Sequence, residues 1–166
     1  MIPDVIGPNL RVLFCGINPG LYSGAVGHHF ARPGNRFWKA LHAAGFTDRI
    51  LPALEQRTLL DHGLGITNLV RRATAGAAEL SADELREGAK RVRRLVCRRE
   101  PKVIAFVGVG AYRTAFGDPG AVVGPQPGRI CRSRIWLLPN PSGLNAHYQL
   151  PELAAAFGAL REAVSS

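Results

Sequence analysis

RVLFCGINPG, residues 11–20, is the stretch that decides the fold of this chain. Its first half is a short apolar run, Val12 to Cys15, and its second half, GINPG, is rich in Gly and Pro. A short apolar run closed by such residues is typical of a buried parallel strand that leads into a loop. Ligands of open α/β folds bind where loops leave the carboxyl ends of strands. We therefore expect Asn18 to face a cleft, and the alternative is an ordinary turn in which Asn18 is structural.

Apolar runs and helical patterns alternate along the rest of the chain. Further strands are expected at residues 66–70, 103–107 and 135–138. Helices are expected at residues 36–44, 51–62, 81–100, 111–116 and 150–164, with loops at 21–33, 71–80 and 117–129. Such alternation predicts a parallel sheet with helices on both faces. The predicted fold class is α/β, a single domain over residues 1–166 that forms a three-layer α/β/α sandwich around a short, mainly parallel four-stranded sheet.

Polar residues lie at the carboxyl ends of three of the predicted strands or in the loops that follow them. They lie in GINPG, in Thr67-Asn68 and in NPSGLN at residues 140–145. The carboxyl ends of parallel strands meet at one edge of a sheet, so these loops are expected to converge on one cleft.

The chain is strongly basic, with 21 Lys and Arg against 12 Asp and Glu and a net charge of +9. A basic chain suits a polyanion, because each phosphate contact releases counterions. The alternative is a solvated basic surface without a partner.

The three cysteines, Cys15, Cys97 and Cys131, are scattered and form no CxxC pair. Neither a zinc site nor an iron–sulfur cluster has its usual spacing, and a sparse, odd set fits a reducing compartment. The sequence also lacks an apolar window of about 18 residues and the features of a signal peptide, so we expect no membrane span and a cytoplasmic location.

The GINPG motif at residues 16–20 and the NPSGLN motif at residues 140–145 resemble those of the mismatch-specific uracil/thymine-DNA glycosylases, a branch of the uracil-DNA glycosylase superfamily. PGNRFWK at 33–39 and GITNLV at 65–70 also match, so the resemblance extends from Arg11 to about Leu160. It implies a monofunctional, monomeric glycosylase of base excision repair that needs no metal or cofactor. Its partner would be duplex DNA with a flipped-out uracil or a related modified or mismatched pyrimidine, in a bacterial-type, nucleoid-associated setting.

The resemblance also assigns roles to residues. Asn18 would be catalytic, because its amide can position the attacking water and favour positive charge on the sugar. Gly20 would leave room beside the pyrimidine 5-position, where a sister branch with a GQDPY-type motif carries Tyr. Phe30 would stack on the base. The substrate-binding set is Gly16, Ile17, Gly20, His29, Phe30, Asn68, Asn140 and Ser142, with Thr74 as a pocket neighbour.

Gly143, Leu144 and Asn145 would form a wedge that enters the gap left by the flipped base. Some relatives carry Arg two residues after this Leu, where the present chain has Ala146 followed by His147. Either His147 replaces that Arg, or pairing of the lesion with guanine matters less.

Two other classes of function are compatible with parts of the sequence. A non-enzymatic nucleic-acid-binding α/β domain would share the scaffold, but the presence of Asn18 favours an enzyme. A nucleotide-binding enzyme would use Gly108 and Gly110, but the GxGxxG pattern fails at Arg113.

Overall fold

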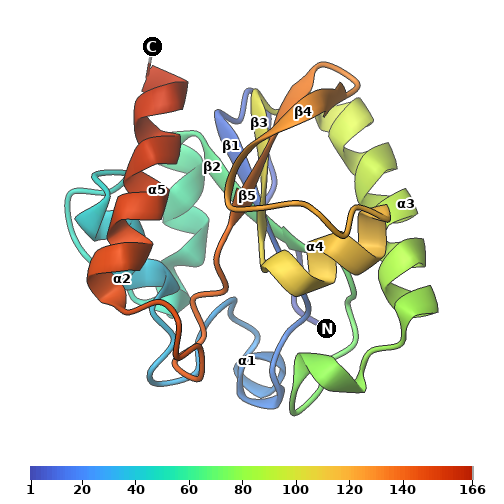
Figure 1. Ribbon diagram of the computed structural model, residues 1–166. Helices are drawn as coiled ribbons and strands as arrows, with labels where there is room; N and C mark the ends of the chain where they lie inside the picture. Colours follow the sequence, from blue (N-terminus) through green and yellow to red (C-terminus); the bar gives the residue numbers. More distant parts are fainter. Residues whose placement is uncertain (166) are drawn as a thin grey trace.

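A computed structural model describes residues 1–165, and a five-stranded sheet lies at its centre (Figure 1). The strand order is β2-β1-β3-β5-β4. Four strands are parallel: β1 (Val12–Gly16), β2 (Leu64–Asn68), β3 (Val103–Val107) and β5 (Ser133–Leu138). The last strand, β4 (Gly124–Ile130), pairs antiparallel with β5 at one edge.

Helices cover both faces of the sheet and complete the predicted three-layer sandwich. One face carries α2 (Phe37–Ala43), the 3-10 helix η1 (Ala53–His62) and α5 (Leu150–Ser165). The other face carries α3 (Ala82–Arg99) and α4 (Val109–Phe116). Side chains of β1 alternate between the layers, as the period of a strand requires: Phe14 packs with Phe37, whereas Leu13 belongs to the opposite cluster.

The boundaries of α3 follow from local chemistry that the sequence reveals. Ser81 Oγ accepts from the Glu84 amide at 3.1 Å, and Glu84 Oε1 accepts from the Ser81 amide at 3.2 Å. This reciprocal capping box satisfies two donors at the helix start. The helix ends where Glu100 adopts a left-handed φ of 50°, directly before Pro101. The exposed β2 edge is covered by Val5, which exchanges two backbone hydrogen bonds of 2.9 Å with Ile66.

The expected loop at residues 117–129 was wrong in part, because it contains most of β4. Pro125 and Pro127 hid this strand from sequence-based reasoning. Proline is tolerated at a sheet edge, where one row of amides pairs with no other strand. The sheet therefore has five strands instead of four.

Other expected boundaries also shift. The first loop contains the short helix α1 (Leu21–Val26), which its central Gly24 concealed, and residues 71–80 contain the 3-10 helix η2 (Ala77–Glu79). Strand β2 begins and ends two residues earlier than the predicted 66–70, so Asn68 is its last residue. None of the helices within residues 1–165 has the length and apolarity needed to cross a membrane.

The cysteines are not all separate, since Cys97 and Cys131 form a disulfide across 34 residues of sequence. The turn between β4 and β5 brings Cys131 to the last turns of α3, a proximity that spacing in the sequence could not reveal. Stable disulfides are uncommon in reducing compartments, so this pair does not fit the compartment expected from the cysteine pattern. Cys15 is free and buried in the core.

Candidate functional site

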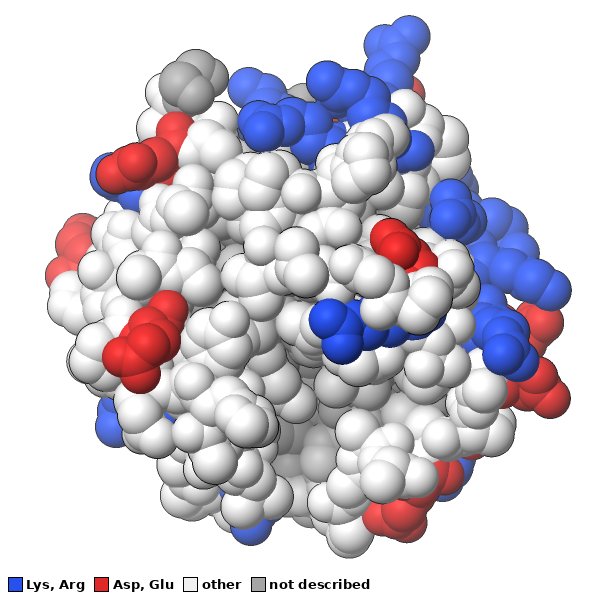
Figure 2. Space-filling model, in the orientation of Figure 1, with Lys and Arg blue, Asp and Glu red and all other residues white. Residues whose placement is uncertain are grey.

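A cavity of about 460 Å³ opens at the carboxyl ends of the parallel strands. It corresponds to the hollow in the lower part of Figure 2, on the side of the molecule where α1 lies in Figure 1. Among the residues proposed from the sequence, those that line it are Ile17, Asn18, Gly20, His29, Phe30, Asn68, Thr74, Asn140, Ser142, Leu144 and Asn145. Gly16 and Gly143 are absent from the lining and act through their backbones, as described below.

The amide of Asn18 has a single possible orientation. Its Nδ2 donates to the carbonyl oxygen of Arg72 at 2.9 Å and to Thr74 Oγ1 at 2.8 Å. A carbonyl oxygen can only accept, so the NH2 group must face Arg72. Thr74 Oγ1 donates its own proton to the Gly76 carbonyl at 2.9 Å and therefore accepts from Asn18. No protein donor within the described part of the chain reaches Asn18 Oδ1, which stays available as an acceptor at the cavity.

The segment around Thr74 runs beside the GINPG loop and supports it. The Thr74 amide donates to the Pro19 carbonyl at 3.1 Å, and Thr74 forms a parallel bridge with Gly20. The Thr74 side chain is buried. Gly20 itself is exposed, and a Cβ placed there would meet no atom within 4 Å. The space beside Gly20 is therefore open.

Asn68 and His29 form a second ordered pair in the cavity wall. His29 Nε2 lies 3.0 Å from the Pro3 carbonyl and must donate to it, so Nδ1 of the neutral ring is an acceptor. Asn68 Nδ2 donates to that Nδ1 at 3.3 Å. Burial lowers the pKa of His29, which favours the neutral ring that this arrangement requires. Arg91 also donates to the backbone carbonyl of Asn68 and anchors the end of β2.

Gly16 packs directly against Asn68 and Phe30, behind the residues that line the cavity. A Cβ at Gly16 would lie 2.6 Å from Asn68 Oδ1 and 3.2 Å from Phe30 Cζ, so a side chain would displace both. The Phe30 ring is supported by Phe37 of α2, with ring centroids 4.1 Å apart and planes 20° from parallel. The position of Phe30 in the wall is therefore set by the core, and its ring still lines the cavity.

The NPSGLN loop is held together by its own polar side chains. Asn140 Oδ1 accepts from the Ser142 amide at 3.0 Å, and Asn145 Nδ2 donates to the Asn140 carbonyl at 3.0 Å. Ser142 Oγ accepts from the Leu144 amide at 3.2 Å. These bonds shape the loop and leave the Leu144 side chain 78% exposed. Gly143 lies against residues 32–35, and a Cβ there would come within 2.8 Å of the Gly34 carbonyl oxygen.

Arg36 clamps this loop to the start of α2, and sequence reasoning assigned it no role. Its guanidinium donates to the carbonyl oxygens of Pro141 at 3.3 Å and Asn145 at 3.3 Å, and also to those of Ser142 and Tyr148. Arg36 lies within the matching stretch PGNRFWK, which was the one available signal. Ile2, from the amino-terminal segment, also lines the cavity and was not foreseen.

His147 lies outside this cavity, in a neighbouring hollow of about 560 Å³ that also contains Arg113 and shares Asn140 and Asn145 with the cavity. Ala146 is exposed and lines neither hollow. Gly108, considered above as part of a nucleotide-binding turn, has a φ of 144°, and a Cβ there would approach Ile17 Cδ1 to 2.8 Å. Packing therefore accounts for this glycine without a bound phosphate.

Comparisons with known proteins agree with this layout. The model of the uracil DNA glycosylase superfamily matches residues 3–163, which include every residue of the cavity lining except Ile2. A solution NMR structure of a candidate uracil DNA glycosylase from Methanosarcina acetivorans is similar, with a TM-score of 0.60 and 21% sequence identity over 96% of each chain. At that level of identity, the likeness shows a shared fold and leaves the activity to be argued from the site.

Proposed function

The chain belongs to the uracil DNA glycosylase superfamily, and from this premise we propose that it is a monofunctional, mismatch-type uracil-DNA glycosylase. It would hydrolyse the bond between deoxyribose and a uracil, or a related modified or mismatched pyrimidine, in duplex DNA. The target bond is inaccessible inside a stacked duplex, so the nucleotide must first rotate into the cavity.

The orientation of the Asn18 amide carries this proposal. With both Nδ2 protons engaged by Arg72 and Thr74, Oδ1 is the atom left to accept a hydrogen bond from water. An amide is too weak a base to remove a proton at neutral pH, so Asn18 contributes position and a carbonyl dipole. The water oxygen bonds to C1′ as the glycosidic bond breaks, and the electron pair of that bond leaves with the base. The proton that the water loses passes to solvent, and the departing base anion takes a proton from solvent. The dipole stabilises the positive charge that develops on the sugar.

Asn68 would recognise the pyrimidine edge through hydrogen bonds. Uracil presents an N3–H donor between two carbonyl acceptors, whereas N3 of cytosine carries no proton. The hydrogen bond from Asn68 Nδ2 to His29 fixes the orientation of the Asn68 amide. Asn68 Oδ1 is then the atom that can accept a hydrogen bond from the uracil N3–H. The remaining amide proton of Asn68 can serve a ring carbonyl. This assignment favours uracil and thymine over unmodified cytosine.

A panel of duplexes tests the proposal. Each carries one uracil, thymine, 5-substituted uracil or ethenocytosine opposite G or A, and excision is scored as alkali-labile abasic sites in the presence of EDTA. We expect uracil to be excised. Asn18→Ala should lower the single-turnover rate by about 10²–10³-fold, as expected for one positioned polar group.

DNA binding by Asn18→Ala should stay close to that of the wild type, because most DNA affinity comes from phosphate contacts elsewhere. Absence of abasic sites from every duplex would contradict glycosylase activity and favour a non-enzymatic DNA-binding domain. Excision by Asn18→Ala at the wild-type rate would remove Asn18 from the mechanism.

A further inference from the structure

The net positive charge of the chain does not lie around the cavity. Arg32 is the one Lys or Arg in its lining. Two nearby arginines are neutralised, since Arg71 pairs with Asp4 at 3.2 Å and Arg72 with Glu84 at 3.0 Å. The guanidinium of Arg36 is occupied by loop carbonyls. The cavity end therefore offers few free cations to hold a phosphate backbone.

The free cations gather at the opposite end of the strands, in a patch that we call the basic pole. It consists of Arg94, Arg98, Arg99, Lys102, Arg129, Arg132 and Arg134. The segments that carry it, residues 94–102 and 129–134, hold seven of the 21 Lys and Arg but one of the 12 Asp and Glu, Glu100. Six of the nine net positive charges thus belong to these 15 residues.

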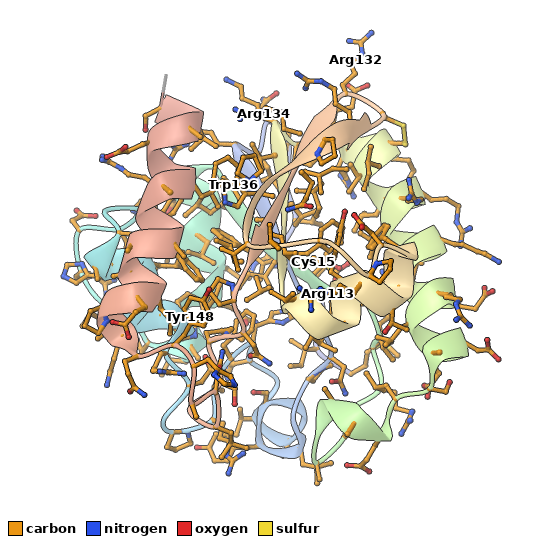
Figure 3. All side chains as sticks on the ribbon, in the orientation of Figure 1. Cys15, Arg113, Arg132, Arg134, Trp136 and Tyr148 are labelled. Atoms are coloured by element: carbon orange, nitrogen blue, oxygen red, sulfur yellow. A yellow bond between two sulfur atoms is a disulfide. The ribbon has the colours of Figure 1, made fainter. Side chains whose placement is uncertain are left out.

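Backbone pairing and a covalent bond bring these segments together. The Arg134 amide donates to the Lys102 carbonyl at 3.0 Å, and Arg129 pairs with Arg134 across the β4–β5 hairpin. The Cys97–Cys131 disulfide joins the hairpin to the end of α3. Figure 2 shows blue side chains over the hairpin and along α3, and Figure 3 places Arg132 and Arg134 at the end of the molecule away from Tyr148.

Interactions within the protein do not account for all seven basic side chains of the basic pole. Arg98 and Arg99 complement the helix dipole at the end of α3, and Arg134 lies 5.8 Å from the Trp136 ring centroid. Arg129 Nη1 donates to the Arg132 carbonyl at 3.1 Å, and the charge of Arg129 has no acidic partner. Within residues 1–165, none of the seven forms an ion pair. The large exposed apolar side chains of the described chain also lie outside the two segments. A protein partner is usually held by buried aromatic or aliphatic anchors, which this surface lacks.

We propose that the basic pole binds the phosphate backbone of a second segment of duplex DNA while the cavity end engages the first. Phosphate binding needs cations and no particular base sequence, and duplex DNA carries one charge per about 1.7 Å of its axis. The molecule would thereby bridge two duplexes and pass between them. Bridging itself does not depend on the proposed glycosylase activity.

A recruitment assay tests bridging directly. Wild-type protein is loaded on an immobilised duplex that carries one U·G pair, the lesion proposed for the cavity end, and capture of a second, labelled undamaged duplex is measured between about 50 and 200 mM salt. The test variant carries Arg98→Gln, Arg99→Gln and Arg132→Gln, and the matched control carries Arg57→Gln, Arg86→Gln and Lys90→Gln. All six side chains are exposed, and each variant loses three charges.

The wild type and the control should capture the second duplex with the same salt dependence. In the test variant, the slope of log K against log salt for that duplex should be smaller by roughly 2–3, the value for three lost phosphate contacts. The reversal Arg132→Glu, analysed alone, provides the same comparison if the triple variant is unstable. Failure of the wild type to capture a second duplex, or equal slopes in the two triple variants, would refute the proposal.

Two further measurements separate the alternatives. Poly-glutamate of matched charge should compete poorly with the labelled duplex, and equal competition would indicate an acidic protein partner instead. Excision from a short uracil duplex at saturating concentration should be the same for both triple variants. If no protein excises uracil but capture of the second duplex is normal, the proposed glycosylase activity is refuted and the proposed DNA binding by the basic pole is supported.

Discussion

Thr74 links the water-holding amide to the backbone through one hydroxyl oxygen, which accepts from Asn18 and donates to Gly76. Thr74→Val keeps the shape and removes both bonds, so Asn18 loses one of its two restraints. A hydrogen bond of this kind contributes about 0.5–1.5 kcal/mol, and we expect the single-turnover excision rate to fall by roughly 2–12-fold with little change in KM. Thr74→Ser should restore the rate. A valine variant as fast as the wild type would show that Arg72 alone holds the amide.

Gly20 is the second single residue with a measurable consequence. A side chain there meets open space, so Gly20→Tyr should fold normally and place its ring beside the pyrimidine 5-position. We expect the excision rate of 5-substituted uracils to fall more than that of uracil. The comparison uses single-turnover rates on matched duplexes opposite G. Equal losses on all substrates would mean that Gly20 serves the turn alone.

His29 should make both stability and activity sensitive to acid. Its folded pKa lies below the ordinary value of about 6.5, so its contribution to stability is present above that value and is lost as pH falls towards the folded pKa. Protonated Nδ1 cannot accept from Asn68, so excision by the folded protein should decline at lower pH, as pH falls through the folded pKa of His29. Thermal melts and excision rates between pH 5 and 8 measure this, with His29→Gln as the control. A parallel pH response in that variant would assign the effect to another group.

At the residue scale, the sequence predicted some residues of the site and not others. Asn18 follows an apolar run, so its place after a strand could be predicted from the pattern, and Asn68 was expected near the carboxyl end of the strand at residues 66–70. The role of Arg36 could not, because its partners are backbone carbonyls more than 100 residues further along the chain. Every residue has a backbone carbonyl, so the sequence cannot indicate which carbonyls Arg36 binds. Only the folded structure shows them.

Among the elements, β1, β3 and α3 were predictable because one strong local signal dominates each. Apolar runs mark the strands, and the Ser81–Glu84 capping box marks the helix start. Strand β4 was not predictable, because most of its residues are not buried and its prolines are typical of a loop, so that only its pairing with β5 identifies it as a strand. Helix α1 has six residues with a central glycine, too few to show a helical period.

The NPSGLN loop yields a prediction about Leu144. Its exposure excludes a core role, so Leu144→Ala should leave the melting temperature nearly unchanged. If Leu144 enters the stack, its removal forfeits contacts that offset unstacking, which costs about a few kcal/mol. We expect the largest loss of excision for paired U·A and the smallest for single-stranded uracil. Equal losses on both substrates would contradict a wedge.

For the molecule as a whole, the Cys97–Cys131 bond is the clearest contributor to stability that sequence reasoning missed. It spans 34 residues, and closing a loop of that length stabilises a fold by about 3–4 kcal/mol in the chain-entropy model. The variant Cys97→Ser, Cys131→Ser should lose that much free energy of unfolding in urea. The excision rate at 25 °C should not change, because the bond lies at the end of the sheet away from the cavity. Reductant should destabilise the wild type equally, and an unaffected wild type would mean that the bond does not form.

Both borders of the sheet are unsuited to adding a strand from another molecule. At β2, Val5 already occupies the free hydrogen-bonding row beside Ile66. At β4, Pro125 and Pro127 bring no amide hydrogen to offer an incoming strand. A parallel sheet of apolar strands would otherwise be a template for fibrils in crowded or concentrated solution. The prolines of β4, which made this strand resemble a loop in the sequence, therefore also disfavour aggregation through the sheet edge.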